Sequence, residues 1–253
     1  MYGICNLAIV PIRIEPNDRS ELVSQLLFGD HFEIIETNKQ WYKIKAYFDS
    51  YEGWIDQKQC QVITEFEYEE LSNNDQILSA DLIEFISNSD DLLLPIPLGS
   101  SLSFLSIESI NKKSFAFEGM KVIGIKPKSE LIKTAFLYLN APYLWGGKTP
   151  FGIDCSGFTQ MVYKLNGYKL SRDASQQASQ GEPLSFIEES EPGDLAFFDN
   201  EEGKIIHVGM IMNDNYIIHA SGKVRIDRLD HLGIYNAELN KHTHKLRVIK
   251  KII

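Results

Sequence analysis

The hydrophobic pattern of the chain changes at Pro127, and this change limits the possible folds more than any other feature. Before Pro127, apolar residues alternate with polar ones in short runs, as in Trp41-Tyr42-Lys43-Ile44-Lys45, and this is the period of half-buried strands. After Pro127, two segments with helical spacing come first and strands follow them. We therefore predict small antiparallel barrels in the first half and an α+β domain in the second.

The first half divides into three predicted parts. Residues 1–64 form a small barrel with a helical turn over 20–27 and short strands near 7–10, 32–36, 41–45 and 53–55. Residues 65–78 form a linker, because five acidic residues and no basic one favour an exposed segment. Residues 79–126 begin with a short helix over 79–86 and continue as strands. Their Gly99 turn is similar to the Gly29 turn, which predicts a second, degenerate barrel.

Residues 127–253 form the predicted α+β domain. Ser129 is a suitable N-cap for a first helix, which must end near Asn140 because Pro142 disfavours helix before it. A second helix begins at Cys155 and ends at Asn166-Gly167. The strands expected after it lie at 195–198, 205–212, 216–221 and 246–252.

Composition excludes several classes of partner. The formal net charge of −10 argues against nucleic acid and anionic membrane, since both favour a basic surface. The sequence contains no run of about 18 apolar residues, so it predicts no membrane helix. The first residues lack a signal-peptide pattern, so we expect a cytoplasmic protein. Three widely spaced cysteines predict neither a disulfide framework nor a thiolate zinc site. The sequence indicates no cofactor and leaves the oligomeric state open.

Cys155 is the candidate nucleophile. Asp154 is a good N-cap residue, and it would place Cys155 in the first turn of the second helix. The unpaired amides and the positive dipole end there favour a thiolate over a thiol. Cys5 and Cys60 lie in apolar, strand-like surroundings, so we expect them to be inert thiols.

His207 and His219 are candidate partners of this cysteine. They lie on two successive predicted strands, and a hairpin that pairs residue 211 with residue 215 would bring them face to face. One can then act as a base while the other orients it. Two alternatives stay open: both histidines are structural, or they bind a metal with no evident third ligand. We expect His242 and His244 to be solvated.

The second half contains six motifs in a fixed order. They are Tyr143-Leu144-Trp145-Gly146-Gly147, Asp154-Cys155-Ser156-Gly157-Phe158, Arg172-Asp173-Ala174, Pro192-Gly193-Asp194-Leu195-Ala196-Phe197-Phe198, His207-Val208-Gly209-Met210-Ile211 and His219-Ala220-Ser221. In order and spacing they resemble the motifs of the NlpC-type cell-wall cysteine peptidases. The resemblance implies a papain-like α+β fold in which Cys155 is the nucleophile, His207 is the base and His219 orients the base. That family cleaves peptidoglycan (murein) stem peptides, most often between the γ-carboxyl of D-glutamate and a diamino acid.

The first half is similar to the bacterial SH-three-like barrels that accompany such peptidases. The similarity rests on the Gly29 turn, on Trp41-Tyr42-Lys43-Ile44 and on Gly53-Trp54-Ile55. Two barrels followed by this catalytic domain resemble the dipeptidyl-peptidase VI subgroup. Those enzymes act in the cytoplasm, in cell-wall recycling, on free stem peptides whose N-terminal L-alanine is unblocked.

The resemblance also assigns substrate contacts. Glu21 and Tyr51 of the first barrel would meet the alanine amine. In the catalytic domain, Tyr143 would lie close to the oxyanion, and the substrate side would be lined by Trp145, Asp154, Ser156, Asp173 and Ser175. Relatives carry serine where this chain has Ala174, so Ser175 is the nearest substitute. The alternative function is a wall-binding multi-barrel protein with a secondary or different amide hydrolase or acyltransferase activity.

Overall fold

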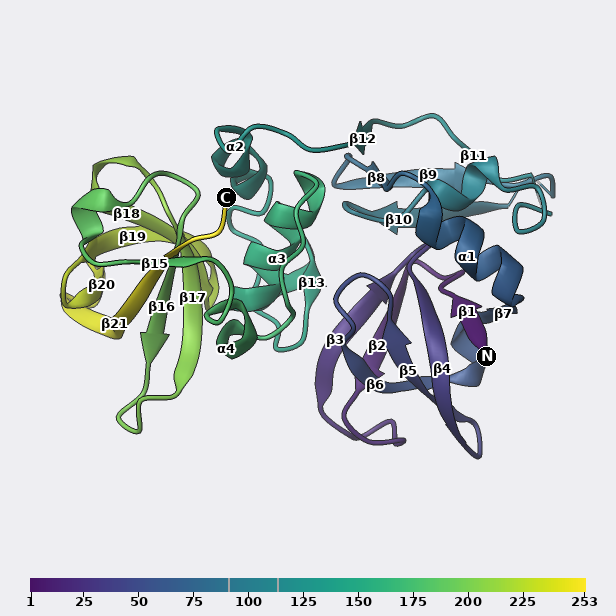
Figure 1. Ribbon diagram of the computed structural model, residues 1–253, viewed down its shortest axis with the longest axis horizontal. Helices are drawn as coiled ribbons and strands as arrows, with labels where there is room; N and C mark the ends of the chain where they lie inside the picture. The colour runs from purple at the N-terminus through teal and green to yellow at the C-terminus, as the bar shows by residue number, and fades with distance from the viewer. Residues whose placement is uncertain (91, 113) are drawn as a thin grey trace. The chain divides into compact units, whose positions relative to one another are not determined.

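The computed structural model describes residues 1–90, 92–112 and 114–253 (Figure 1). The chain divides into two compact units, Met1–Ile125 and Lys126–Ile253. The division falls beside Pro127, where the hydrophobic pattern changes from short alternating runs to helical spacing.

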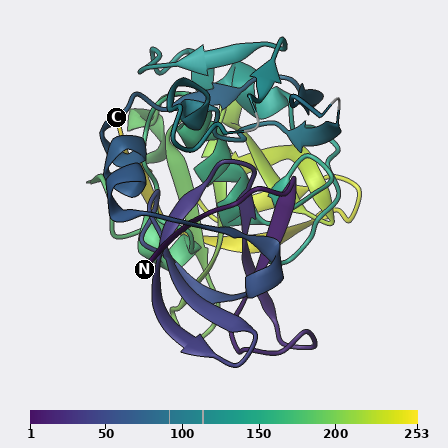
Figure 2. The ribbon, with the colours of Figure 1, turned by 90° about the vertical axis from the view of Figure 1, so that its right-hand side faces the viewer.

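The N-terminal unit begins with an antiparallel barrel that buries an aliphatic core. The strand order is β3-β2-β6-β5-β4-β1-β7, and Figures 1 and 2 show how these strands curl. Val10, Ile12 and Ile44 fill the interior, where Cys5 also lies. Burial raises the pKa of the Cys5 thiol well above its usual range, as expected for an inert cysteine. The strands are β1 (Tyr2–Ile4), β2 (Ile9–Arg13), β3 (Leu22–Leu27), β4 (His31–Asn38), β5 (Trp41–Ala46), β6 (Glu52–Asp56) and β7 (Gln61–Ile63).

Two local predictions in this region are wrong. Segment 20–27 contains strand β3 rather than a helical turn, because it pairs along β2 and buries Leu26. The predicted linker 65–78 contains helix α1 (Glu65–Asn73). Thr64 and Glu67 form a capping box at its start, and Leu71 is buried on its inner side. The acidic composition of this segment led to the linker prediction, although the segment also has a capping box and a buried apolar residue that favour a helix.

The rest of this unit consists of short strands. They form a three-stranded sheet, β10-β9-β11, and a two-stranded sheet, β12-β8. The helix predicted over 79–86 is wrong: this segment contains the end of β8 and most of β9. It is extended because β9 pairs with β10 on one side and with β11 on the other. The elements are β8 (Ile77–Ser79), β9 (Ile83–Ser87), β10 (Leu93–Pro97), the 3₁₀ turn η2 (Ser103–Ser106), β11 (Ala116–Phe117) and β12 (Lys121–Ile123).

The Gly99 turn repeats the backbone pattern of the Gly29 turn. The Gly29 N–H donates to the carbonyl of Cys5 at 2.8 Å, and the Gly99 N–H donates to that of Ser79 at 3.0 Å. Both glycines have positive φ, 78° and 84°. Cys5 and Ser79 each donate in return to the residue after the glycine. The similarity seen in the sequence therefore reflects two turns of the same geometry.

The strand pairing of the first barrel is also repeated in the second part of the N-terminal unit. Ile9 pairs with Leu27 between β2 and β3, and Ile83 pairs with Pro97 between β9 and β10, at the same distance from each glycine turn. β1 pairs with β7, and β8 pairs with β12 in the corresponding place. Where the first barrel has its β4–β5 hairpin, this second part has η2.

The C-terminal unit places helices against a seven-stranded sheet with order β15-β21-β16-β17-β18-β19-β20. Helices come first and sheet strands later, as predicted. Ser129 precedes the first helix, although its side chain makes no capping bond. The elements are α2 (Glu130–Phe136), β13 (Lys148–Thr149), β14 (Gly152–Ile153), α3 (Cys155–Leu165), α4 (Ala174–Gln177), β15 (Glu182–Leu184), β16 (Leu195–Asp199), β17 (Ile205–Ile211), β18 (Tyr216–Ser221), β19 (Lys223–Asp230), β20 (Gly233–Asn236) and β21 (Lys241–Lys251).

Candidate active site

Cys155 is fixed at the first position of α3. Asp154 is the N-cap, with extended backbone, and its side chain accepts a hydrogen bond from the Gly157 N–H at 2.6 Å. Every residue of α3 is buried, and the helix packs on β17 and β18. Cys155 itself is only 7% exposed. The predicted helix start is confirmed, and the thiol faces the strands that carry the two histidines.

Asp154 also anchors the loop before α3. One of its oxygens accepts from the Gly146 N–H at 2.8 Å, and the buried Arg172 guanidinium contacts both of its oxygens, at 3.0 and 2.5 Å. Arg172 also donates to the Ser156 hydroxyl at 3.0 Å. Asp154 and Ser156 were expected to line the substrate side. In this structure their polar atoms bind Arg172 and shape the nucleophile turn.

Arg172→Met is expected to destabilise the protein by about 3–5 kcal/mol, because it leaves the buried Asp154 carboxylate without its cation. The matched control is Lys204→Met, whose ion pair with Glu202 is largely exposed and should contribute little. Denaturant unfolding of both variants measures the difference. Equal stabilities for the two variants would contradict a structural role for the Arg172–Asp154 pair.

The resting state of Cys155 differs from the sequence expectation. The pKa of the thiol is raised to about 12, mainly by burial and then by the charge of Asp154, while a hydrogen bond from the Val208 backbone and the charge of Arg172 lower it less. The helix start was expected to favour a thiolate. Desolvation and the adjacent carboxylate outweigh this effect, so the thiol needs a base at the moment of attack.

His207 and His219 meet as predicted, although the hairpin register is different. Ile211 pairs with Ile217 rather than with residue 215, because Asp214 and Asn215 both adopt positive φ and extend the turn. The register shift is two residues, so both histidines stay on one face of the sheet. His207 Nε2 lies 2.8 Å from His219 Nδ1. This contact uses the Nε2 atom of His207 and leaves its other ring nitrogen, Nδ1, outside the pair.

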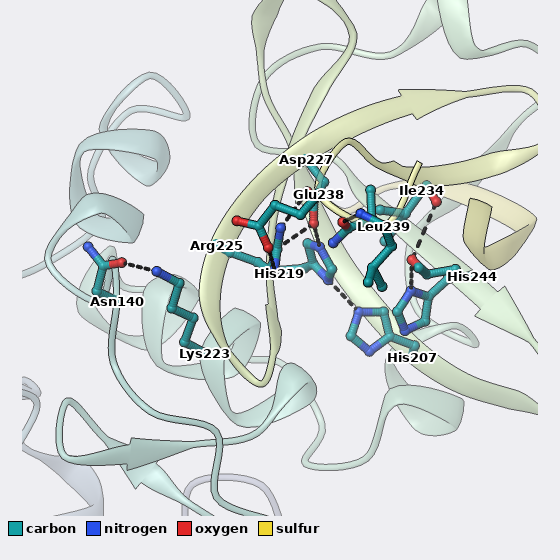
Figure 3. Close-up of polar contacts among 12 residues, drawn as sticks. Asn140, His207, His219, Lys223, Arg225, Asp227, Ile234, Glu238, Leu239 and His244 are labelled. Atoms are coloured by element: carbon teal, nitrogen blue, oxygen red, sulfur yellow. Dashed lines mark hydrogen bonds and ion pairs between the residues drawn. The ribbon is translucent and has the colours of Figure 1, made fainter. Parts of the chain in front are cut away.

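A third polar side chain extends this pair, and the sequence reasoning missed it. His219 Nε2 lies 3.0 Å from Asp227 Oδ2, on the neighbouring strand β19 (Figure 3). Asp227 is buried and accepts two hydrogen bonds from Arg225. The sequence signal that could have identified Asp227 is the segment Arg225-Ile226-Asp227. Alternate residues of a strand share a face, so Arg225 and Asp227 lie on the same face of the sheet.

Both histidines are neutral in the resting site. Burial lowers the pKa of His207 well below its usual value, and His219 and His244 lower it further. Burial also lowers the pKa of His219, although the Asp227 carboxylate opposes this. A neutral His207 has one unprotonated ring nitrogen, so it can accept the proton of Cys155.

His244 belongs to the site, which corrects the expectation that it is solvated. Its ring stacks on that of His207, with centroids 4.1 Å apart and an interplanar angle of 25° (Figure 3). Burial lowers the pKa of His244 to about 4, so it is uncharged near neutral pH. It therefore covers one face of His207 without placing a second positive charge beside it. His242 is exposed and bonds to Asp230.

A pocket of about 300 Å³ borders His207. Its lining residues are Tyr143, Ile206, His207, Ala220, Ser221, Gly222 and His244. Burial and the charge of Cys155 raise the pKa of Tyr143 to about 12, so the phenol stays protonated and can donate a hydrogen bond. Trp145, on the loop before the nucleophile, is 58% exposed.

The other predicted contacts lie on elements other than α3, β17 and β18. Asp173 is the N-cap of α4, and Ser175 is exposed in its first turn. Glu21 and Tyr51 belong to the N-terminal unit and precede β3 and β6. Both strands pair antiparallel with β2, so the two residues lie at the same end of the barrel.

Two negative findings apply to the described part of the chain. In residues 1–90, 92–112 and 114–253, no three His, Cys, Asp or Glu side chains converge in a way that could hold a metal ion. Within the same ranges, no helix combines the length and the apolar character that crossing a membrane requires.

The cluster as a whole is suited to acyl transfer. Cys155 is the candidate nucleophile at the start of α3, His207 can take a proton, and the contact with His219 can hold that base in place. The protonated phenol of Tyr143 can donate a hydrogen bond to the negative oxygen of a tetrahedral intermediate.

Known proteins share both units. Residues 140–245 match the NlpC/P60 family, and residues 12–59 match the bacterial dipeptidyl-peptidase Sh3 domain. A gamma-D-glutamyl-L-lysine dipeptidyl-peptidase of Bacillus cereus is 27% identical over 79% of this chain and 68% of its own length. Dipeptidyl-peptidase 6 of Lysinibacillus sphaericus is 28% identical over 91% of this chain and 92% of its own length.

A solved structure shows the same fold over the whole chain. The crystal structure of an NlpC/P60 family protein from Bacillus cereus covers 100% of this chain and 99% of its own, with a TM-score of 0.81 and 19% sequence identity. One Sh3 domain is matched, and it lies within the predicted first barrel. The chain therefore combines an NlpC/P60 cysteine peptidase domain with a bacterial dipeptidyl-peptidase Sh3 domain.

Proposed function

We propose that this enzyme cleaves the γ-D-glutamyl–diamino acid bond of free murein stem peptides that begin with an unblocked L-alanine. The observation that carries the proposal is the hydrogen-bonded pair of His207 and His219 on the strands against which the Cys155 helix packs. Support also comes from two relatives that cover most of this chain, named gamma-D-glutamyl-L-lysine dipeptidyl-peptidase and dipeptidyl-peptidase 6.

The reaction runs in two steps. Cys155 Sγ attacks the γ-carbonyl carbon of D-glutamate while its proton moves to His207 Nδ1, and the carbonyl oxygen becomes an oxyanion near Tyr143. The C–N bond then breaks, and the leaving amine takes the proton from His207. Water attacks the resulting thioester, gives a proton to His207 and releases L-Ala-D-Glu. The cysteine finally regains its proton.

Recognition of the free amine is assigned to the first barrel. Glu21 and Tyr51 lie at one end of that barrel, immediately before the two strands that flank β2. A carboxylate and a phenol are suitable partners for an ammonium group. In intact wall the alanine nitrogen is acylated, so it carries no charge and extra bulk. A site built for the ammonium group therefore discriminates against intact wall.

N-acetylation of L-Ala-γ-D-Glu-L-Lys is expected to lower kcat/KM about 5- to 150-fold, because it leaves the carboxylate of the site unpaired at a cost of about 1–3 kcal/mol. Glu21→Gln should lower kcat/KM for the free tripeptide and reduce the difference between the two substrates. Glu15→Gln, an exposed acid on the same hairpin, is the control. Equal rates on free and acetylated tripeptide would refute recognition of the amine.

The alternative is a wall-binding protein with a secondary amide hydrolase or acyltransferase activity. Incubating the enzyme with free tripeptide and with intact wall, followed by mass analysis of the products, separates the two functions. The proposed function predicts L-Ala-D-Glu from the tripeptide and little release from wall. Tight binding to wall without cleavage of the tripeptide would support the alternative.

Two further parts of the proposal concern architecture and location. We infer that residues 79–126 are a second, degenerate SH-three-like barrel; the repeated glycine turn and the repeated β9–β10 register support this. We also propose that the enzyme acts in the cytoplasm, where stem peptides released from the wall are recycled. Fractionation of cells that express the full chain measures this location.

A further inference from the structure

Asp227 is held in a closed set of hydrogen bonds behind His219. Its Oδ2 atom accepts from Arg225 Nε at 2.7 Å and lies 3.0 Å from His219 Nε2, while its Oδ1 atom accepts from Arg225 Nη2 at 3.1 Å. Arg225 also donates to Glu238 at 3.2 Å. Figure 3 shows Asp227, His219 and His207 in one continuous chain of contacts. Both oxygens of Asp227 are therefore occupied, and its position is fixed.

The state of Asp227 decides which nitrogen of His219 carries the proton. Burial alone would raise the pKa of this carboxyl, but the hydrogen bonds from His219 and Arg225 lower it overall. An ionised carboxylate can only accept hydrogen bonds. The contact at 3.0 Å therefore requires a proton on His219 Nε2, and His219 Nδ1, being unprotonated in the neutral ring, becomes an acceptor.

The histidine pair has no such preference by itself. The contact of 2.8 Å between His207 and His219 can form in two ways, with the proton on either nitrogen. If His207 donates, its Nδ1 atom is unprotonated and can act as a base. If His219 donates, the single proton of the neutral His207 ring sits on Nδ1, and the ring cannot accept the thiol proton.

We propose that Asp227 is a positioning residue that sets the tautomers of both histidines and so keeps His207 Nδ1 free to deprotonate Cys155. Arg225 supports this by donating to both oxygens of Asp227. The inference rests on the proposed function only in that Cys155 and His207 are taken as nucleophile and base. Its direct readout, the protonation of the two rings, needs no substrate.

The test is NMR of ¹⁵N-histidine-labelled enzyme together with kinetics. In the wild-type enzyme both His207 and His219 should carry the proton on Nε2. In Asp227→Leu, which has no acceptor, we expect His207 to populate the Nδ1-protonated form. We expect kcat to fall about 10- to 100-fold, with KM within about twofold. If that variant does not fold, Asp227→Asn, which keeps the shape but not the charge, takes its place.

Asp230→Asn is the matched control. Asp230 lies on the same strand, and His242 contacts it at 2.9 Å, but both side chains lie on the surface outside the catalytic cluster. The control should leave kcat and the His207 signals unchanged. An Nδ1 proton on His207 in the wild-type enzyme, or wild-type kcat in the Asp227 variant, would overturn the inference. If the tripeptide is not a substrate, the rate of Cys155 alkylation by iodoacetamide replaces kcat.

Discussion

Cys155→Ala is expected to reduce turnover of the free tripeptide by at least about 10³-fold while the protein stays folded. The thiol at the start of α3 is the proposed nucleophile, so its loss removes the covalent step. The substitution deletes one atom from a helix that is anchored by Asp154 and buried along its length, so a small loss of stability is expected. Tripeptide hydrolysis followed by chromatography measures the first effect, and thermal unfolding measures the second.

Cys60→Ala is the control for this prediction. Burial raises the pKa of Cys60 to about 11, and this half-buried thiol lies in the N-terminal barrel. Its removal should leave turnover unchanged. Residual activity above a few per cent in Cys155→Ala, with Cys60→Ala fully active, would rule out Cys155 as the nucleophile.

His207→Ala is expected to be nearly as damaging as Cys155→Ala, since the buried thiol has a pKa of about 12 and depends on this base. His219→Asn should be milder, with a loss of about 10- to 100-fold. An asparagine oxygen can still accept the His207 proton, although its side chain is too short to span the distance to Asp227.

The order of these effects tests the assigned roles. Steady-state kinetics of the two variants should show the loss mainly in kcat, because neither histidine is proposed to bind the ground state of the substrate. A greater loss in His219→Asn than in His207→Ala would reverse the roles of the two histidines.

Much of the site could be predicted from local signals. A capping residue before Cys155 and two histidines on consecutive strands are short-range features, and the helix start and the histidine contact are both as expected. The register of the hairpin was wrong by two residues, because the positive φ of Asp214 and Asn215 could not be anticipated from residue type alone. The even shift preserved the face of the sheet, and this is why the contact survived.

What the sequence could not predict depends on packing over long distances. His244 reaches His207 because β21 crosses the sheet and pairs with β20, β16 and β15, and nothing near residue 244 indicates this. The Asp227 side chain reaches His219 only once β19 adds to β18 in the observed register, in which His219 pairs with Arg225. The state of Cys155 was also mispredicted, since burial and the Asp154 charge outweigh the helix start only when the full environment is present.

The most direct test of the account is to let the enzyme hydrolyse free L-Ala-γ-D-Glu-L-Lys in the presence of hydroxylamine and to identify the products by mass. A thioester on Cys155 partitions between water and the added nucleophile. The account therefore predicts free lysine together with both L-Ala-D-Glu and its γ-hydroxamate. The hydroxamate should increase with hydroxylamine concentration. Turnover that yields only L-Ala-D-Glu at every concentration, or cleavage at a different bond, would contradict it.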